Sequence, residues 1–208
     1  MPKYETYQDI ESIPDSVDCV VSPGRQLSLG WDLESALAQP YGLSPMSHLN
    51  VLAGAMVAEA TEGTLVVTGN KNAGFPQGAG VLLAERYPDV PSILEFTSPT
   101  TLASARHVAP LLGTVIRESG LVEVVITSDG PQGKRLASML ADHGVAVRGI
   151  AIAHKIVAHS VLPSDQALVD SYERDRWNRR MEDAKQTGLR KADPRGTRVE
   201  NLARRFRP

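Results

Sequence analysis

The chain has 208 residues and a formal net charge of −2, with 42% hydrophobic and 22% charged residues. This is the usage of an ordinary globular domain, which excludes disorder over the whole length and fibrous architectures. No apolar run reaches the roughly 20 residues that a membrane span needs, and the first residues lack the basic and then apolar pattern of a secretory signal. The sequence therefore predicts no membrane association and a cytoplasmic location.

The single cysteine, Cys19, excludes an intrachain disulfide and any zinc site built from several cysteines. Its expected role is that of a small apolar residue buried on a strand. The five histidines show no HExxH spacing or similar pairing, so no metal site is predicted.

The charge is unevenly distributed along the chain. Residues 171–208 hold 12 Lys and Arg against 6 Asp and Glu, whereas residues 1–170 hold 10 against 18. A basic end on an acidic body indicates an intramolecular contact, a subunit contact or an anionic partner such as nucleic acid.

In chain order, the β-branched runs predict five strands, at residues 17–21, 64–68, 92–96, 122–127 and 145–153. Between them, helices are predicted at 47–60 with Ser47 as N-cap, at 81–87, after Thr101, and at 134–142 with Gly144 at its C-terminal end. Pro110 should kink or divide the third of these helices. The breaker-rich residues 23–46 predict a long loop, and residues 165–186 a charged helix.

This alternation, with strands nearly continuous in Val, Ile and Leu, is typical of a parallel sheet covered by helices on both faces. We predict an α/β fold: a three-layer Rossmann-like domain with about five mostly parallel strands. The domain is expected over residues 1–160, followed by a basic helical extension over 161–208.

In such sheets, ligands bind beyond the carboxyl ends of the strands, where helix N-termini favour anions. The loops after the first four predicted strands are rich in glycines, hydroxyls, amides and cations, which suit an anionic ligand. No loop matches the GxGxxG or GxxxxGK[ST] pattern. The predicted ligand-binding residues are Ser22, Gly24, Arg25, Gly69, Asn70, Lys71, Asn72, Ser98, Thr100, Thr101, Thr127, Ser128, Lys134 and Arg135.

Two carboxylates in these loops are candidates for proton chemistry. Glu95 ends the third strand, and Asp129 lies in the Ser-Asp-Gly turn after the fourth, so either could act as a general base or accept a hydrogen bond from a ligand hydroxyl. The alternative for Asp129 is a structural one, because Asp commonly caps a helix or forms a turn.

The order and spacing of these segments resemble the YdcF/SanA/ElyC-like family of bacterial Rossmannoid domains over about residues 17–150. The matching segments are VVSPG at the first strand, VVTGN at the second, Glu95 with Ser98 and Thr100 or Thr101 at the third, and ITSDGPQGKR at the fourth. The resemblance implies a Rossmann-like fold and a small ligand. It makes S-adenosylmethionine a possible cofactor, which the residues alone leave unknown.

The chain also departs from the family pattern. His48 or Leu49 lies where the family has an Arg that opens a helix, Gly69-Asn70 replaces a glycine pair, and Pro131 occupies the usual His position. Lys134 or Arg135 can stand for the terminal Arg of the motif. A reaction that depends on the missing His is therefore not expected here.

The expected function is binding of a small anionic or nucleotide-like ligand, such as S-adenosylmethionine or a phosphorylated metabolite, with group transfer on a small molecule as a further option. The rival hypothesis is a non-catalytic module whose basic tail engages nucleic acid or a protein partner. We favour a tail that docks on the acidic body or on a second copy of the chain through Tyr172, Trp177 and Met181. A homo-oligomer formed through this tail is therefore expected.

Overall fold

The computed structural model describes residues 4–24, 40–69, 75–98, 100–114 and 123–174. The chain divides into two compact units, Met1–Val169 and Asp170–Pro208. The fold and the candidate site described below belong to the first unit. In the second unit, the described residues 170–174 continue a helical segment that begins at residue 163.

The first unit alternates strands and helices. The strands are β1 (Glu5–Tyr7), β2 (Cys19–Pro23), β3 (Thr64–Thr68), β4 (Ser92–Glu95), β5 (Val124–Ser128) and β6 (Val147–Ile152). The helices are α2 (Pro45–Ala60), α3 (Phe75–Arg86), α4 (Thr101–Thr114), α5 (Pro131–Ala141) and α6 (Ala153–Val157), with a short 3-10 turn η1 at Pro40–Gly42.

The six strands form one sheet in the order β1-β6-β5-β2-β3-β4, and every pairing is parallel. From β2 the chain moves outward through β3 to β4, then returns to place β5 on the other side of β2 and continues outward to β6. The direction of winding therefore reverses between β2 and β5. This doubly wound arrangement confirms the predicted three-layer Rossmann-like fold, with six strands where about five were predicted.

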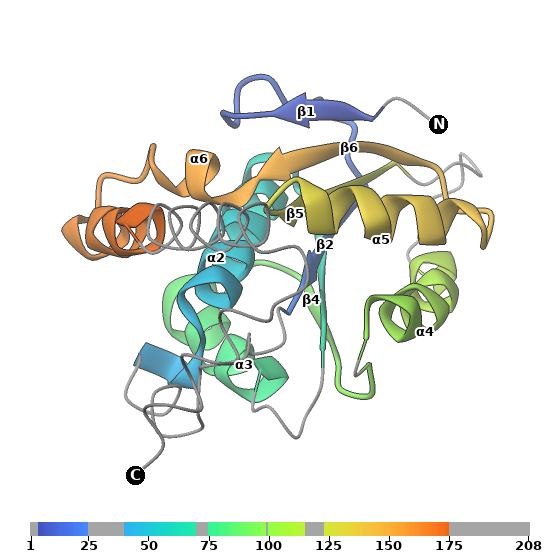
Figure 1. Ribbon diagram of the computed structural model, residues 1–208, viewed down its shortest axis with the longest axis horizontal. Coiled ribbons are helices and arrows are strands. Elements are labelled where there is room, and N and C mark those ends of the chain that lie inside the picture. The colour runs from blue at the N-terminus through green and yellow to red at the C-terminus, as the bar shows by residue number, and fades with distance from the viewer. Residues whose placement is uncertain (1–3, 25–39, 70–74, 99, 115–122, 175–208) are drawn as a thin grey trace, which may run out of the picture. The chain divides into compact units, whose positions relative to one another are not determined.

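Helices cover both faces of the sheet (Figure 1). The connections from β2 to β4 place α2 and α3 on one face, with α6 beside α2, and the later connections place α4 and α5 on the other. This follows from the right-handed crossover of parallel strands, which changes face when the direction of winding reverses.

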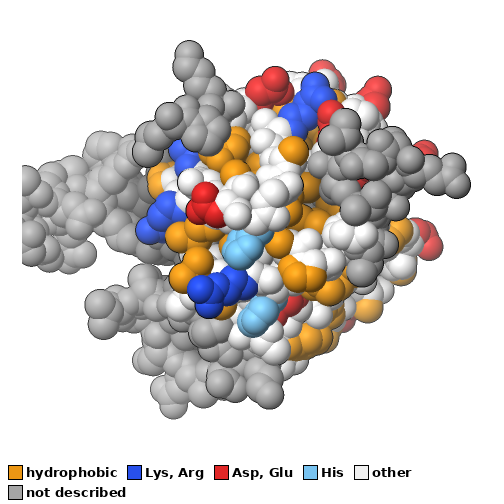
Figure 2. Space-filling view, turned by 90° about the vertical axis from the view of Figure 1, so that its right-hand side faces the viewer, with side chains coloured by type: hydrophobic (Ala, Val, Ile, Leu, Met, Phe, Trp, Pro, Cys, Tyr) orange, Lys and Arg blue, Asp and Glu red, His pale blue; other side chains and the backbone are white. Residues whose placement is uncertain are grey.

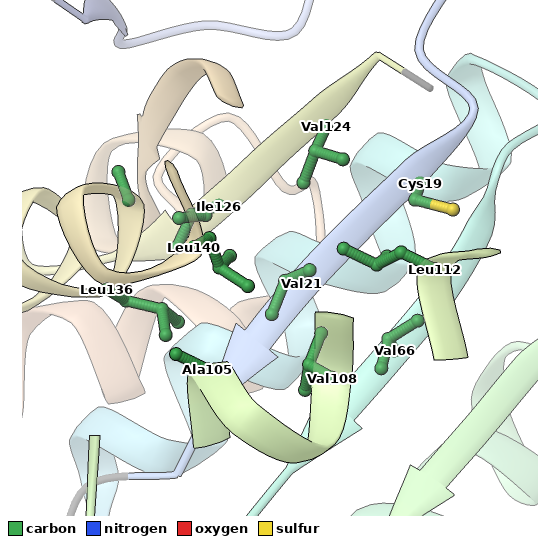
Figure 3. Close-up of a cluster of buried hydrophobic side chains, with 11 residues drawn as sticks. Cys19, Val21, Val66, Ala105, Val108, Leu112, Val124, Ile126, Leu136 and Leu140 are labelled. Atoms are coloured by element: carbon green, nitrogen blue, oxygen red, sulfur yellow. The ribbon is translucent and has the colours of Figure 1, made fainter. Parts of the chain in front are cut away.

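One hydrophobic core fills the space between the sheet and the α4 and α5 layer (Figure 3). Val21 and Ile126 of the central strands face Ala105 and Val108 of α4 and Leu136 of α5, and all five are fully buried. Cys19 is also fully buried in this core, which confirms its predicted place on a strand.

The predicted strands are confirmed, with ends that shift by a few residues. The Thr64–Thr68 strand has the predicted bounds, and Gly144, with φ of 79°, follows the end of α5 as predicted. Three elements escaped prediction: β1, whose three residues are too short to show a pattern, the turn η1 within the predicted loop, and α6, which follows β6 without a breaker.

The predicted start of α2 was wrong. The helix begins at Pro45, and Ser44 rather than Ser47 is the N-cap, since its side chain accepts a hydrogen bond from the Ser47 amide at 3.2 Å. A proline at the first helical position after a serine is a recognised start signal. α3 and α5 likewise begin earlier than predicted, and α4 continues undivided past Pro110 to Thr114.

Among the residues that the structure describes, no helix has both the length and the apolar character needed to cross a membrane. In the same residues, no group of three or more His, Cys, Asp or Glu side chains is arranged to hold a metal ion.

Candidate functional site

The reversal between β2 and β5 brings together two strand ends that are far apart in the sequence. Ser22 and Pro23 end β2, and Thr127 and Ser128 end β5, its parallel neighbour. Ligands of open α/β sheets bind beyond the carboxyl ends of the two strands at such a reversal, because the two following chain segments diverge there.

A closed set of hydrogen bonds joins β2, β5 and α2 at this point. The Ser22 and Thr127 hydroxyl oxygens lie 2.5 Å apart, and each lies within 3.0 Å of the Asn50 carbonyl oxygen. Two hydroxyl hydrogens serve these three contacts, so neither hydroxyl has a hydrogen left for another group. Both side chains are fully buried. These two predicted ligand-binding residues therefore contact each other, and they fix α2 to the sheet.

Two amide side chains hold the chain that leaves β2. Asn50 Nδ2 donates to the Pro23 carbonyl at 2.8 Å, and Gln132 Nε2 donates to the Gly24 carbonyl at 3.2 Å. A backbone carbonyl can only accept a hydrogen bond, so each amide nitrogen must face it and each amide oxygen must face elsewhere. The orientation of both amides is thus fixed by their partners.

Among the residues that the structure describes, three buried polar atoms around these strand ends have no hydrogen-bond partner: Asn50 Oδ1, Gln132 Oε1 and Ser128 Oγ. Asn50 and Ser128 are fully buried, and Gln132 is 8% exposed. A buried polar group without a partner costs about 1–3 kcal/mol, so such atoms are rare in folded proteins. They lie together at the strand ends where open α/β sheets commonly bind ligands, so they define the candidate site. We call this site the switch-point set: Ser22, Asn50, Thr127, Ser128 and Gln132.

Gly54 explains how α2 approaches the strands so closely. A Cβ at this position would lie 2.1 Å from Ser22 Oγ and 3.2 Å from Thr127 Oγ1. Gly54 is one helical turn after Asn50 and therefore shares its face. The missing side chain is what allows the Asn50 carbonyl to reach the two hydroxyls.

The first turn of α5 follows β5 directly. Pro131 has no N–H, and the Gln132 amide donates to Asp129 Oδ1 at 3.1 Å. The carboxylate of Asp129 thus already accepts a hydrogen bond from one of the amides at the N-terminus of α5. This agrees with the structural alternative for Asp129, in which it caps a helix or forms a turn. Lys134 and Arg135 lie on the same helix with exposed side chains.

A second cluster of polar side chains surrounds Glu95 at the end of β4. Thr68 Oγ1 donates to Glu95 Oε2 at 2.6 Å, while the Thr97 amide and hydroxyl donate to Oε1 at 2.6 and 2.5 Å. Burial raises the pKa of Glu95, but hydrogen bonds from Ser98, Thr68 and Thr97 outweigh it and hold the pKa below its ordinary value. The side chain is therefore a buried carboxylate, not a neutral acid, at physiological pH.

His107 of α4 completes this cluster, which we call the Glu95 set: Thr68, Glu95, Thr97, Ser98 and His107. Its Nδ1 lies 2.9 Å from Thr97 Oγ1, 3.1 Å from Ser98 Oγ and 3.4 Å from Glu95 Oε1. The Thr97 and Ser98 hydroxyls donate to Glu95, so only their lone pairs face the ring. The geometry therefore favours a hydrogen on Nδ1, which leaves Nε2 of the neutral ring as a proton acceptor.

The two predicted catalytic carboxylates lie at different strands. Glu95 ends β4 and Asp129 follows β5, with β3 and β2 between them. Three strand spacings of about 4.8 Å give a separation on the order of 14 Å along the sheet. The two carboxylates are thus too far apart to act on one atom, and a ligand that reaches both must be extended.

The structure places the other predicted residues as follows. Gly24 and Gly69 lie against the ring of Phe75, which a Cβ at either position would meet at 2.6 and 2.4 Å. Thr100 Oγ1 accepts from the Ala103 amide at 3.2 Å in the first turn of α4, whose first residue is Thr101. Arg25, Asn70, Lys71 and Asn72 lie outside the described residues.

His48, which with Leu49 was a candidate for the Arg position of the resemblance, lies in the same helix as Asn50, α2. Its ring packs edge-on against Tyr41 with centroids 5.5 Å apart, and it is 8% exposed. Burial, together with the nearby positive charge of Arg86, lowers the pKa of His48 to about 4. His48 is therefore neutral at physiological pH, unlike the Arg of the family pattern.

Sequence reasoning did not identify Asn50, Gln132 or His107 as site residues. A signal existed for Asn50, because it is a polar residue within the long apolar run of α2 and precedes Gly54 by one turn. No comparable signal marks Gln132 or His107, whose partners are distant in the sequence.

Figure 2 shows the side of the molecule that carries α4 and α5. Among its described side chains, histidine and basic groups lie at the surface between apolar and uncharged ones, and no broad area of one charge is visible. The exposed side chains that α4 and α5 contribute include Arg106, His107, Lys134 and Arg135.

Comparison of the chain with protein-family models, curated proteins and solved structures found no match.

Proposed function

We propose that this protein is a YdcF-like domain that binds a small nucleotide-like or phosphorylated metabolite at the carboxyl ends of β2 and β5. The observation that carries the proposal is the presence of three unpartnered buried polar atoms at the reversal of the sheet. A ligand there would supply the hydrogen bonds that the chain itself does not. The sequence resemblance over about residues 17–150 supports the same ligand class.

A thermal-shift screen of the full chain tests this proposal. The probes are S-adenosylmethionine, nucleotides, phosphosugars and a generic oligonucleotide. Binding to the native state raises stability by mass action, by about 2.7 kcal/mol when the ligand is at 100 times its Kd. We expect a small molecule to stabilise the chain. Stabilisation by the oligonucleotide alone would instead support the rival role of the basic tail.

A second candidate function, proton transfer during a group-transfer reaction, is favoured by the Glu95 set. His107 is 45% exposed, whereas Glu95 beside it is 6% exposed. Nε2 of His107 would take a proton from water or from a ligand hydroxyl, and the Glu95 carboxylate would stabilise the resulting imidazolium. The water or hydroxyl oxygen that has lost its proton would form a bond to an acyl or phosphoryl group of the ligand. The bond from that group to its leaving group would break, and the imidazolium would give its proton to the leaving group.

Long-range ¹H–¹⁵N NMR spectra of the histidine rings test the arrangement on which this candidate depends. We expect the neutral His107 ring to carry its hydrogen on Nδ1. The variant His107→Gln is used to assign the His107 signal, and His143→Gln is the control at an exposed histidine. A hydrogen on Nε2 would exclude the base role. Turnover of any ligand found in the screen should fall in His107→Gln, and undiminished turnover would also exclude it.

A further inference from the structure

The switch-point set shows which chemical groups of a ligand it can recognise, because its hydrogen-bonding capacity can be counted. This inference rests on the proposed function, and it concerns the part of the ligand that lies at the ends of β2 and β5.

The unpartnered atoms are mostly acceptors. Asn50 Oδ1 and Gln132 Oε1 are amide oxygens, and both amide nitrogens face the backbone carbonyls of Pro23 and Gly24. An amide oxygen has two lone pairs and no hydrogen. These two atoms therefore require a ligand group that donates hydrogen bonds.

The neighbouring hydroxyls cannot reverse this preference. Ser22 and Thr127 use both of their hydrogens in contacts with each other and with the Asn50 carbonyl. Ser128 Oγ, which has no partner, is the one hydroxyl of this set that can still donate as well as accept.

A bare anion does not suit this arrangement. Phosphate and carboxylate oxygens are acceptors, and they would face two amide oxygens that also only accept. Asp129 further reduces the capacity for an anion, because its carboxylate already accepts from the Gln132 amide at the start of α5.

We infer that the switch-point set binds a hydroxyl-bearing group, such as the ribose of a nucleotide or the sugar of a phosphosugar, and that the anionic group of the ligand lies elsewhere. A sugar hydroxyl donates to an amide oxygen and at the same time accepts from Ser128. Adjacent hydroxyls would engage Asn50 and Gln132 together, since these two side chains hold consecutive residues of the chain leaving β2.

The experiment uses calorimetric titration and thermal shift on the full chain. A panel of the four ribonucleoside monophosphates identifies the best binder. This ligand is then compared with its 2′,3′-dideoxy analogue, with ribose 5-phosphate, with free ribose and with inorganic phosphate. We expect loss of the two hydroxyls to weaken binding at least about tenfold, because two buried amide oxygens are left without donors. Inorganic phosphate alone should not stabilise the chain.

Ser128→Ala provides a matched variant. It removes a buried hydroxyl that has no partner, so it should raise the stability of the ligand-free chain or leave it unchanged, while weakening binding of the ribonucleotide about three- to tenfold. Ser138→Ala, at an exposed serine of α5, the helix that follows β5, should change neither quantity.

The outcomes separate this inference from the proposed function. Equal affinity for the dideoxy analogue, or stabilisation by phosphate alone, would overturn the inference and leave the proposed function standing. Binding of free ribose with no response to any phosphorylated probe would support the inference and overturn the anionic part of the proposed function. No response to any probe would overturn both.

Discussion

The switch-point set and the Glu95 set lie at the same edge of one sheet, yet their buried polar groups differ in charge and in how fully they are hydrogen-bonded. The first is uncharged, and three of its atoms have no partner. The second holds a buried carboxylate that accepts from both threonines and from Ser98, beside a partly exposed imidazole. A buried charge needs hydrogen-bond partners for its lone pairs, because burying it without them costs a large free energy. Neutral amides and hydroxyls can remain without a partner in the ligand-free chain at a smaller free-energy cost. The difference supports the proposals of a binding role for the first set and a proton-transfer role for the second.

The largest expected effect is the change of stability with pH that His48 causes. His48 belongs to neither set, so its contribution must be measured before a pH dependence is assigned to either set. Because burial lowers its folded pKa from 6.5 to about 4, the unfolded state binds more protons between these values. The contribution of the neutral His48 ring to the free energy of unfolding is therefore fully present above pH 6.5. It is lost as the pH falls toward 4, by about 3 kcal/mol at 1.36 kcal/mol per pKa unit.

His48→Phe tests this, since it keeps an aromatic ring against Tyr41 and removes the titration. Urea unfolding at several pH values should show a smaller loss between pH 6.5 and 4 in the variant than in the parent chain. An equal loss in both would show that another group is responsible.

The next largest effect should come from Gly54→Ala at the switch-point set. The new Cβ would meet Ser22 Oγ at 2.1 Å and Leu65 Cδ1 at 2.8 Å, both fully buried. Overpacking of this kind costs about 1–3 kcal/mol. The matched control is Gly113→Ala in α4, where a Cβ meets nothing within 4 Å. There the higher helix propensity of Ala should raise the free energy of unfolding by about 0.5–1 kcal/mol. Chemical denaturation measures both, and equal effects would contradict the close approach of α2.

A pair of identical substitutions compares the two sets directly. Thr68 and Thr127 are both fully buried strand residues, but Thr68 donates to a carboxylate and Thr127 to a backbone carbonyl. Thr68→Val should cost about 1.5–3 kcal/mol, because a hydrogen bond to a charged group is lost. Thr127→Val should cost about 1 kcal/mol or less, because Ser22 can still donate to the Asn50 carbonyl.

The Thr68→Val effect should also depend on pH. The folded pKa of Glu95 is below its ordinary value of 4.5, so the stability that its hydrogen bonds contribute is present above pH 4.5. It is lost as the pH falls through the folded pKa. Denaturation curves should therefore show the Thr68 variant converging on the parent chain in acid, while the Thr127 difference stays constant. A constant difference in both variants would argue against an ionised Glu95.

Local sequence patterns were sufficient for most of the fold. The run Thr64–Thr68 predicted its strand without error, because a buried parallel strand is a short continuous apolar segment between breakers. The N-cap of α2 was misplaced by three residues, since Ser44 and Ser47 are both acceptable caps and only the Pro45 position distinguishes them. A helix or strand is predicted from residues that are contiguous in the sequence, so an error in one element does not affect the prediction of the others.

The sequence by itself thus determined the alternation of strands and helices, the parallel sheet and the edge where a site would form. Only the tertiary structure decided which side chains meet there. Thr127 lies 105 positions from Ser22 and 77 from Asn50, and His107 reaches Thr97 from a different element. The physical reason is that periodicity depends on neighbours along the chain, whereas hydrogen bonds between strand ends depend on the order of strands in the sheet and on how closely each helix packs against it.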